Sequence, residues 1–352
     1  MKSPLRSLFF AIGLLSLTLP TPASAAGHEL SAALPSVCNS GLPVKLTPSL
    51  KMGISITQPE VIGVVPQGVR ASPYFTGGTM QEVGGTLSGT IQDAGGDWWN
   101  LRLDGVMELD IIGPIFQATD GTLGEFRGKG RGDMGPDGFG NFLQWILPSK
   151  IQIRSVLEFR TPLGSTIEHF NATPLLAVGY VEPTALAITF DISAFGEQTD
   201  ASFCQTALPM AVQYVSSFKL KALDTTSFSK SDGDQLIQYT YAPGIAVGPE
   251  LKGVVVPGAT LRARVHPDGV ADMSLQATLR AASGEAILVN SGGRANFVPQ
   301  RGSRVPLRIQ PDVLAEGTKL DVLNRNSMLF VGEVDTTSGE LVLHLYRMPV
   351  DI

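Results

Sequence analysis

The chain has 352 residues, of which 16% are charged, and its formal net charge at pH 7 is -6. A chain with so few basic residues lacks the electrostatic footprint of a nucleic-acid-binding protein and the polybasic patch that binds anionic membranes. Its length exceeds the size at which a single hydrophobic core stops growing, so two domains are expected.

The first residues have the pattern of a secretory signal peptide. Lys2 and Arg6 give a positive start, an apolar run of about a dozen residues follows, and Ala23-Ser24-Ala25 offers small residues for cleavage. The apolar run is shorter than the roughly 20 residues needed to cross a bilayer. We therefore expect residues 1–25 to be removed, no stable membrane insertion, and a secreted or periplasmic protein.

The rest of the chain matches itself in an ordered series, which indicates a tandem duplication. At an offset of 164 residues, Asp268-Gly269-Val270 matches Asp104-Gly105-Val106. Nearer the C-termini, Val331-Gly332 matches Val178-Gly179 at an offset of 153. A series of matches that keeps its order along the chain is not expected by chance, so we infer two copies of one domain.

The change of offset locates an insertion in the first copy. Copy one carries about eleven extra residues, which lie between residues 130 and 171. We expect them in the glycine-rich loop 128–140. The predicted domains are copy one at residues 26–197 and copy two at residues 198–352.

The two cysteines, Cys38 and Cys204, occupy equivalent places in the two copies. In an exported chain an even pair of cysteines suggests a disulfide, and the alternative is two separate buried thiols. We expect a disulfide that joins the two domains.

The local pattern is that of β-strands. Leu50, Met52, Ile54 and Ile56 alternate with polar or small residues, which is the period of a half-buried strand. Other short apolar runs are bounded by glycine and proline, and no long amphipathic helix is predicted. Many short strands with such turns are typical of an all-β sandwich or barrel.

A β-hairpin is predicted where residues 98–103 and 106–112 flank Asp104-Gly105. A two-residue turn would pair Leu103 with Val106, and directly opposed residues share a face of the sheet. One face would then carry Asp97, Trp99, Leu101, Leu103, Val106, Glu108 and Asp110, and the other Trp98, Asn100, Arg102, Met107, Leu109 and Ile111. Such mixed faces are expected of a barrel interior that holds a ligand.

The residues of this hairpin also carry a family resemblance. The chain resembles the family known as domain of unknown function 3237 in Asp97-Trp98, Arg102, Asp104-Gly105, Glu108, Asp110, Asp120-Gly121 and the glycine-rich segments 77–79 and 85–90. Copy two resembles the end of the family pattern in Leu323-Asn324, Phe330-Val331-Gly332 and Tyr346.

The resemblance implies small antiparallel β-barrels whose interior can hold a small molecule, and some fungal relatives are associated with cyclisation or isomerisation. The expected fold is therefore all-β, with two tandem antiparallel β-barrel domains related by internal duplication. Family members are mostly single domains without a signal peptide. Copy two has Leu261-Arg262 in place of Asp97-Trp98 and Ser274 in place of Asp110, so any activity that needs those groups is expected in copy one.

Glu108 and Asp110 are the candidate catalytic residues. They are next neighbours on one predicted face, about 7 Å apart by strand rise, and two carboxyl groups in a partly dry cavity can act as general acid and base. In the alternative, both point to solvent while Met107, Leu109 and Ile111 fill the core, since carboxylates are mostly exposed.

Asp97, Trp98, Trp99 and Arg102 are the candidate ligand-binding residues. Arg102 could hold an anionic ligand or pair with a neighbouring carboxylate, and Trp98 could be a ligand platform or a plug of the barrel. The four histidines have no ligand spacing, so neither a metal nor a cofactor is expected.

Three functions are compatible with these features. The first is an exported protein that binds a small apolar or mixed-polarity organic ligand, with the pocket best kept in copy one. The second is an isomerase or cyclase that uses the carboxyl groups of copy one. The third is a structural module of the cell envelope. Nothing in the sequence indicates an oligomeric state.

Overall fold

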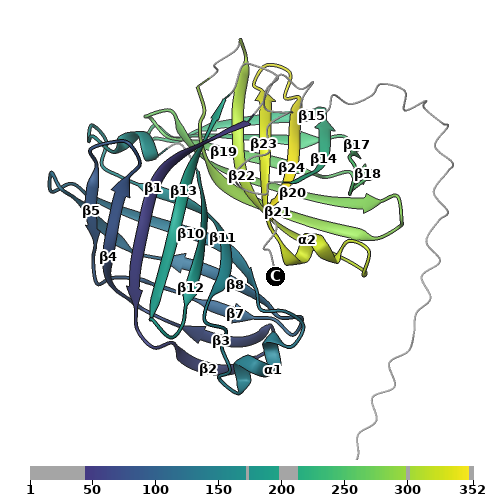
Figure 1. The fold of residues 1–352 in the computed structure, drawn as a ribbon. Coiled ribbons are helices and arrows are strands. Elements are labelled where there is room, and N and C mark those ends of the chain that lie inside the picture. The colour runs from purple at the N-terminus through teal and green to yellow at the C-terminus, as the bar shows by residue number, and fades with distance from the viewer. Residues whose placement is uncertain (1–43, 172–173, 198–212, 299–301, 349–352) are drawn as a thin grey trace, which may run out of the picture. The chain divides into compact units, whose positions relative to one another are not determined.

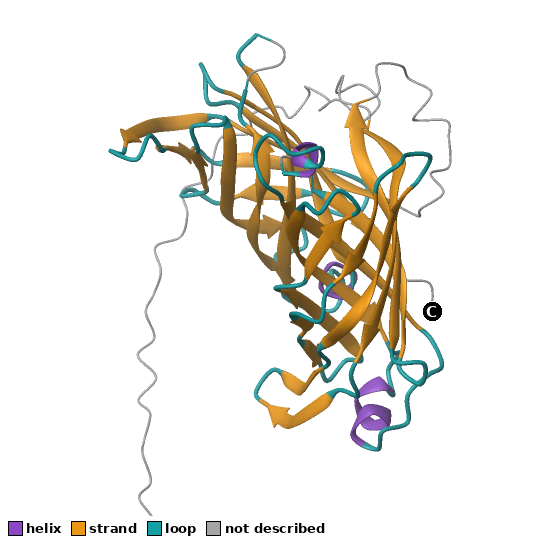
Figure 2. Ribbon diagram, turned by 90° about the vertical axis from the view of Figure 1, so that its left-hand side faces the viewer, coloured by secondary structure: helices purple, strands orange, loops and turns teal. Residues whose placement is uncertain are grey.

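The computed structural model describes residues 44–171, 174–197, 213–298 and 302–348 (Figure 1). The predicted signal peptide, Cys38 and Cys204 lie outside these residues, so export and the disulfide stay predictions. In the described part of the chain the regular secondary structure is almost all β-strand, with only short helices (Figure 2). None of the helices within it is long and apolar enough to cross a membrane.

The first copy forms a closed antiparallel barrel, which we call barrel one. Eight strands follow one another around it, and the ring closes where β10 pairs with β11. In ring order they are β11 (Ile151–Arg160), β12 (Leu175–Glu182), β13 (Ala187–Glu197), β1 (Val44–Ile56), β4 (Phe75–Glu82), β5 (Ser88–Ile91), β9 (Ile115–Ala118) and β10 (Leu123–Asp133).

A branch of the same sheet continues from β10 and carries the predicted hairpin. It runs through β8 (Val106–Ile112), β7 (Trp99–Leu101), β3 (Gly68–Ser72) and β2 (Glu60–Val65), and β6 (Gly96–Asp97) pairs with β8. Two short helices, α1 (Gly138–Leu143) and the 3-10 helix η2 (Glu168–Phe170), lie on either side of β11 in the chain.

The second copy forms barrel two on the same plan. Its ring closes where β20 pairs with β21, and it again has eight strands. They are β20 (Val270–Ala281), β18 (Gly253–Val255), β17 (Gly244–Val247), β14 (Gln213–Leu220), β24 (Leu341–Met348), β23 (Ser327–Asp335), β22 (Arg304–Ala315) and β21 (Ala286–Asn296). The branch is β19 (Thr260–Val265), β16 (Gln235–Tyr241) and β15 (Ala222–Ser229), and α2 (Asp321–Arg325) precedes β23.

The shared topology confirms the predicted pair of duplicated β-barrels. Matched side chains also make matched contacts. The Asn171 Oδ1 atom accepts a hydrogen bond from the amide of Thr161 at 2.7 Å, and Asn324 Oδ1 accepts one from the amide of Ala315 at 2.7 Å. Asn171 thus ties the segment after β11 to the end of that strand, and Asn324 does the same for β22.

The extra residues of copy one lie in the connection between β10 and β11, which includes α1, whereas β21 and β22 are joined by a shorter link. The predicted loop 128–140 is only partly a loop, because β10 continues to Asp133. Glycine serves a packing purpose in that strand: a Cβ atom on Gly130 would lie 2.5 Å from the carbonyl oxygen of Arg154. Gly130 therefore marks a close approach of two strands, whereas Gly135, with a φ of 77°, lies in the connection beyond β10.

Candidate functional site

The turn of the β7–β8 hairpin differs from the prediction by one residue. The amide of Arg102 donates to the carbonyl oxygen of Val106 at 2.9 Å, and the amide of Gly105 donates to that of Arg102 at 3.1 Å. Gly105 has a φ of 82°, which favours glycine. These contacts define a three-residue turn, so Leu101 lies opposite Met107, not opposite Glu108.

A shift of one residue turns every side chain of a strand to the other face. The predicted faces were therefore wrong for the second strand of the hairpin. The buried core of barrel one includes Trp99, Leu101, Met107, Leu109 and Ile111. Glu108 and Asp110 alternate with these residues and lie on the opposite face of β8, as the alternative reading of the sequence had it.

The surroundings of Glu108 are those of an ion-pair network on the outer face of the sheet. Its side chain is 40% exposed, and Arg102 Nη1 lies 3.7 Å from Glu108 Oε1. Asn100 Nδ2 donates to Glu108 Oε2 at 3.0 Å, and Arg102 Nη2 binds Asp104 Oδ2 at 2.6 Å. Arg102 thus pairs with neighbouring carboxylates, which is the structural role considered for it.

The same outer face binds carbonyl groups of barrel two. Arg102 Nη1 donates to the carbonyl oxygen of Asn324 at 2.9 Å, and Arg131 Nη1 donates to that of Asn326 at 2.7 Å. In return, Arg325 Nη2 binds Asp133 Oδ2 at 2.7 Å. Carbonyls at the end of a helix lack partners within it, so the arginines of barrel one satisfy the end of α2. Burial lowers the pKa of Arg131.

The carboxyl group inside barrel one belongs to Asp97, which is 0% exposed. Trp99 Nε1 donates to Asp97 Oδ2 at 2.9 Å, and the amide of Asp110 donates to Asp97 Oδ1 at 3.1 Å. The hydrogen bond from Asp110 lies where β6 ends and β7 has not yet begun. Burial is the main cause that raises the pKa of Asp97 to about 7, against the two hydrogen bonds. The prediction that Asp97 and Trp99 share one face is thus correct. Trp98 is half-buried, and its ring meets that of Tyr74 edge to face.

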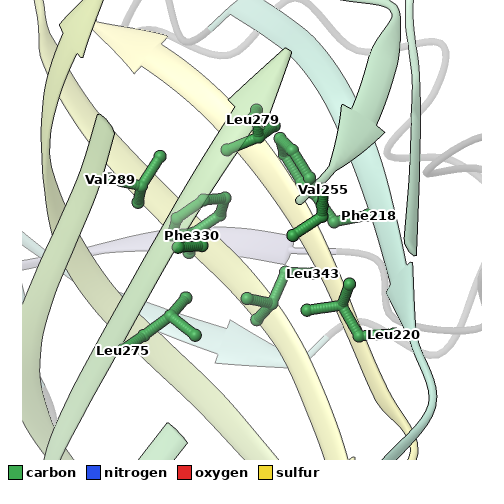
Figure 3. Close-up of a pocket in the computed structure, with 9 residues that line it drawn as sticks. Phe218, Leu220, Val255, Leu275, Leu279, Val289, Phe330 and Leu343 are labelled. Carbon is green, nitrogen blue, oxygen red and sulfur yellow. The ribbon is translucent and has the colours of Figure 1, made fainter. Parts of the chain in front are cut away.

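Barrel two holds a small cavity in its interior (Figure 3). Its volume is about 10 Å³, which is room for roughly one water-sized group. Every side chain around it is apolar, and the rings of Phe218 and Phe330 meet edge to face with their centroids 5.4 Å apart. The lining residues are Phe218, Leu220, Val255, Leu275, Ala277, Leu279, Val289, Phe330 and Leu343.

Strand register identifies the interior side chains that differ between the two barrels. Leu343 lies opposite Gly332, and its equivalent Phe190 lies opposite Gly179. The pairing of the neighbouring strands likewise matches Leu279 with Phe116 and Val289 with Phe126. Barrel one therefore places phenylalanine at three positions where barrel two has leucine or valine, and its rings of Phe116 and Phe126 pack on Phe159 at 5.6 and 5.5 Å. Two exchanges run the other way, since Phe330 matches Ala177 and Phe218 matches Met52.

Comparison with known proteins finds a family model that matches barrel one. Residues 44–195 match the model of the family described as "Protein of unknown function (DUF3237)". No curated protein matches the chain in sequence.

Several solved structures are similar to part of the chain. A conserved protein of unknown function from Rhodopseudomonas palustris is 19% identical, with a TM-score of 0.38, and the match covers 44% of this chain and 98% of that one. A β-barrel-like protein from Acinetobacter baumannii AYE is 21% identical over 44% of this chain and 97% of its own, with a TM-score of 0.36. An enzyme from Penicillium herquei is 17% identical over 41% and 98%, with a TM-score of 0.33.

Proposed function

We propose that this chain, whose residues 44–195 match the model of the DUF3237 family, is an exported protein that binds a small apolar molecule in the interior of barrel two. The observation that carries the proposal is the cavity among Phe218, Phe330 and Leu343, in which every lining residue is apolar. An eight-stranded barrel has an interior wide enough for side chains or for one small ligand. The pocket predicted for copy one stays a prediction.

The chemistry of the lining selects the ligand. A water molecule needs two to four polar partners, and this cavity offers none from its lining side chains. An apolar group placed there gains contact with the surrounding side chains and costs no polar desolvation. The present volume fits one small group, so a larger ligand requires the rings of Phe218 and Phe330 to turn about their side-chain bonds.

Barrel one supplies the variants that test the proposal. Leu343→Phe and Val289→Phe give barrel two the side chains that barrel one carries at these positions. We expect cyclopentane, titrated in sealed tubes and followed by ligand-observed NMR, to bind the wild-type protein and to lose at least tenfold in affinity to either variant. The matched control is Leu288→Phe, on the exposed face of β21 beside Val289, which should bind as the wild type does.

Two outcomes would overturn the proposal. One is wild-type protein that does not bind cyclopentane. The other is equal binding by the wild-type protein, Leu343→Phe and Val289→Phe. If the wild-type protein binds no small molecule, the third function inferred from the sequence, a structural module of the cell envelope, would be favoured.

Export is the second part of the proposal, and the N-terminal pattern supports it. Cleavage after Ala25 would give a mature protein that begins at Ala26. Edman sequencing or intact-mass measurement of protein recovered from the native host decides the point. A protein that retains Lys2 and Arg6 would contradict export by this signal.

An isomerase or cyclase in barrel one is the second candidate function, and Asp97 favours it more than Glu108 or Asp110 does. A carboxyl group with a pKa of about 7 is tuned for proton transfer at neutral pH. The test is hydrogen–deuterium exchange at the carbon beside the carbonyl of small ketones in D₂O. An Asp97-dependent enzyme loses exchange in Asp97→Asn and keeps it in Glu108→Gln. Exchange at the uncatalysed rate in the wild type would reject this candidate.

A further inference from the structure

One end of barrel one carries a group of exposed apolar side chains, which we call the apolar tip. The tip is formed by the β2–β3 hairpin, the turn between β7 and β8, and α1 with the residues that follow it (Figure 1). Its exposed members are Ile62, Val64, Leu103, Leu143, Trp145 and Ile146. Large apolar side chains gathered in one region of a surface mark a site of contact with another apolar surface.

Backbone contacts hold the three segments of the tip side by side. A Cβ atom on Gly68, in the β2–β3 hairpin, would lie 3.1 Å from Arg102 Cα, so this hairpin packs on the β7–β8 turn. The same turn contacts the segment that leads into α1, because the amide of Met134 donates to the carbonyl oxygen of Gly105 at 2.9 Å. A Cβ atom on Gly138, the first residue of α1, would lie 3.4 Å from Gly105 Cα. The apolar side chains of the three segments are therefore presented together.

The charges around the tip are balanced. Residues 61–69 and 138–149 contain no charged residue, and each segment lies between one acidic and one basic residue, Glu60 and Arg70 for the first and Asp137 and Lys150 for the second. The surface of a zwitterionic lipid layer has the matching composition, since its headgroups carry one charge of each sign and its acyl chains accept apolar side chains but exclude charged ones. An anionic lipid layer would instead attract an excess of basic residues, which the tip lacks.

Trp145 ends α1 in a backbone conformation that normally belongs to glycine. Its φ is 57°, its amide donates to the carbonyl oxygen of Phe142 at 2.9 Å, and the amide of Ile146 donates to that of Asn141 at 2.8 Å. These hydrogen bonds form a Schellman motif, in which glycine is the usual left-handed residue because other residues cost stability there. A partly exposed tryptophan at this place suits a membrane–water interface, where tryptophan is enriched.

The corresponding end of barrel two is charged. The branch of its sheet ends in β15 as that of barrel one ends in β2, and the turn from β15 to β16 contains Lys230, Asp232 and Asp234. Lys230 Nζ binds Asp232 Oδ2 at 2.6 Å. The helix α1 belongs to the extra residues of copy one, so the apolar tip is a property of barrel one and does not follow from the shared fold.

We propose that the apolar tip docks barrel one reversibly on the surface of a zwitterionic lipid bilayer. The apolar side chains enter the outer part of the acyl layer, and the flanking charged residues stay among the headgroups. This contact lies at the surface of the bilayer, so it agrees with the expected absence of stable membrane insertion. It is independent of the ligand proposed for barrel two.

The test uses the protein without residues 1–25, because the predicted signal peptide would itself bind lipid. We expect this protein to sediment with phosphatidylcholine vesicles. Leu103→Asp and Ile146→Asp, at side chains that are 73% and 55% exposed, should each lower the partition coefficient by roughly tenfold, because each places a charge in the apolar contact. The matched control is Leu223→Asp, 69% exposed on β15, which should bind as the wild type does.

Fluorescence quenching tests whether the tip makes the contact. Vesicles that contain brominated phosphatidylcholine should quench the fluorescence of Trp145. Trp145→Phe keeps an aromatic ring, so we expect it to bind these vesicles and to lose most of the quenching. Quenching that is undiminished in Trp145→Phe would place the contact elsewhere and overturn the proposal.

Two further outcomes would overturn it. One is wild-type protein that does not bind phosphatidylcholine vesicles, or binds them no better than Leu103→Asp and Ile146→Asp do. The other is wild-type protein that forms dimers in sedimentation velocity and becomes monomeric in these variants, without binding vesicles, which would assign the tip to a second copy of the chain. Neither outcome bears on the binding of cyclopentane by barrel two.

Discussion

The two barrels have the same strands in the same order and different interiors. Barrel one fills its centre with the rings of Phe116, Phe126 and Phe190 and holds the carboxyl group of Asp97 at 0% exposure. Barrel two has smaller side chains at these positions, a cavity lined by apolar side chains and the buried hydroxyl of Tyr241. The strand pattern thus fixes the fold in both copies, while a few interior positions decide what each barrel can do.

The difference is sharpest at two neighbouring positions of the hairpin. Asp97 matches Leu261 and Trp99 matches Ala263, and all four residues are buried. The polar pair of barrel one is therefore replaced by two apolar residues in barrel two. Exchanging residues between equivalent positions tests the comparison directly.

Trp99→Ala should have the largest effect on barrel one. Ala263 shows that alanine fits the fold at this position, but barrel one has no other side chain to fill the space of the indole ring. We expect a loss of about 4 kcal/mol in the free energy of unfolding, measured by urea denaturation and followed by the fluorescence of Trp98 and Trp145. Trp145→Ala, at a side chain that is 37% exposed, should cost much less. Equal losses would contradict the account.

Asp97 should make barrel one less stable as the pH rises. Its pKa is about 7 in the folded protein and 3.8 without the fold. Between these values the folded protein holds a proton that the unfolded chain has released, so stability falls by up to roughly 4 kcal/mol from pH 4 to pH 7 and above. Asp97→Leu, which copies Leu261, should abolish this dependence in urea denaturation at a series of pH values. A dependence unchanged in the variant would refute the assignment.

His344 should give barrel two the opposite dependence. Burial lowers its pKa to about 4 from 6.5. Below pH 6.5 the His344 side chain takes up a proton in the unfolded chain but stays neutral in the folded barrel. The free energy of unfolding therefore falls by roughly 3 kcal/mol as the pH drops toward 4. Its Nδ1 atom lies 2.6 Å from Ser217 Oγ, and His344→Asn keeps a polar group near this hydroxyl. The acid-side loss seen by circular dichroism should vanish in that variant, and its persistence would exclude His344 as the cause.

The smallest expected effects come from moving one hydroxyl between the barrels. Tyr241 and Phe75 occupy equivalent places, because their amides donate to the carbonyl oxygens of Ala259 and Gly95, which match at the offset of 164 residues. Tyr241→Phe should raise the free energy of unfolding of the ligand-free protein by about 1–3 kcal/mol, because it removes a buried group without a partner. Phe75→Tyr should lower it by a similar amount. Differential scanning calorimetry of both variants is the measurement. A less stable Tyr241→Phe would mean that the hydroxyl already has a partner in the free protein.

The duplication and the strand-rich fold were predictable because both follow from order and periodicity along the chain. The register of the hairpin was not, since Asp104-Gly105 suits a two-residue turn as well as the last part of a three-residue turn. That single residue decided whether Glu108 or Met107 faced the core. Asp97 was placed correctly beside Trp99, although its distinction from the other carboxylates depends on burial, which the sequence does not display.

Other features depend on residues that are distant in the chain. Arg131 binds carbonyl oxygens of Leu323 and Asn326, and no local pattern marks an arginine for backbone partners so far away. The cavity of barrel two likewise depends on side chains from several strands. Comparing the copies position by position shows changes in both directions, because Leu279, Val289 and Leu343 are smaller than the phenylalanines that they match, while Phe218 and Phe330 are larger than Met52 and Ala177.

The most direct test of the central claim is a methyl NMR titration of the whole protein with cyclopentane. The account predicts that shifts are confined to methyl groups around the cavity of barrel two, such as those of Leu279, Val289 and Leu343, while those of barrel one, such as Ile111 and Leu157, stay in place. Shifts centred on barrel one, or none in either barrel at saturating cyclopentane, would contradict it.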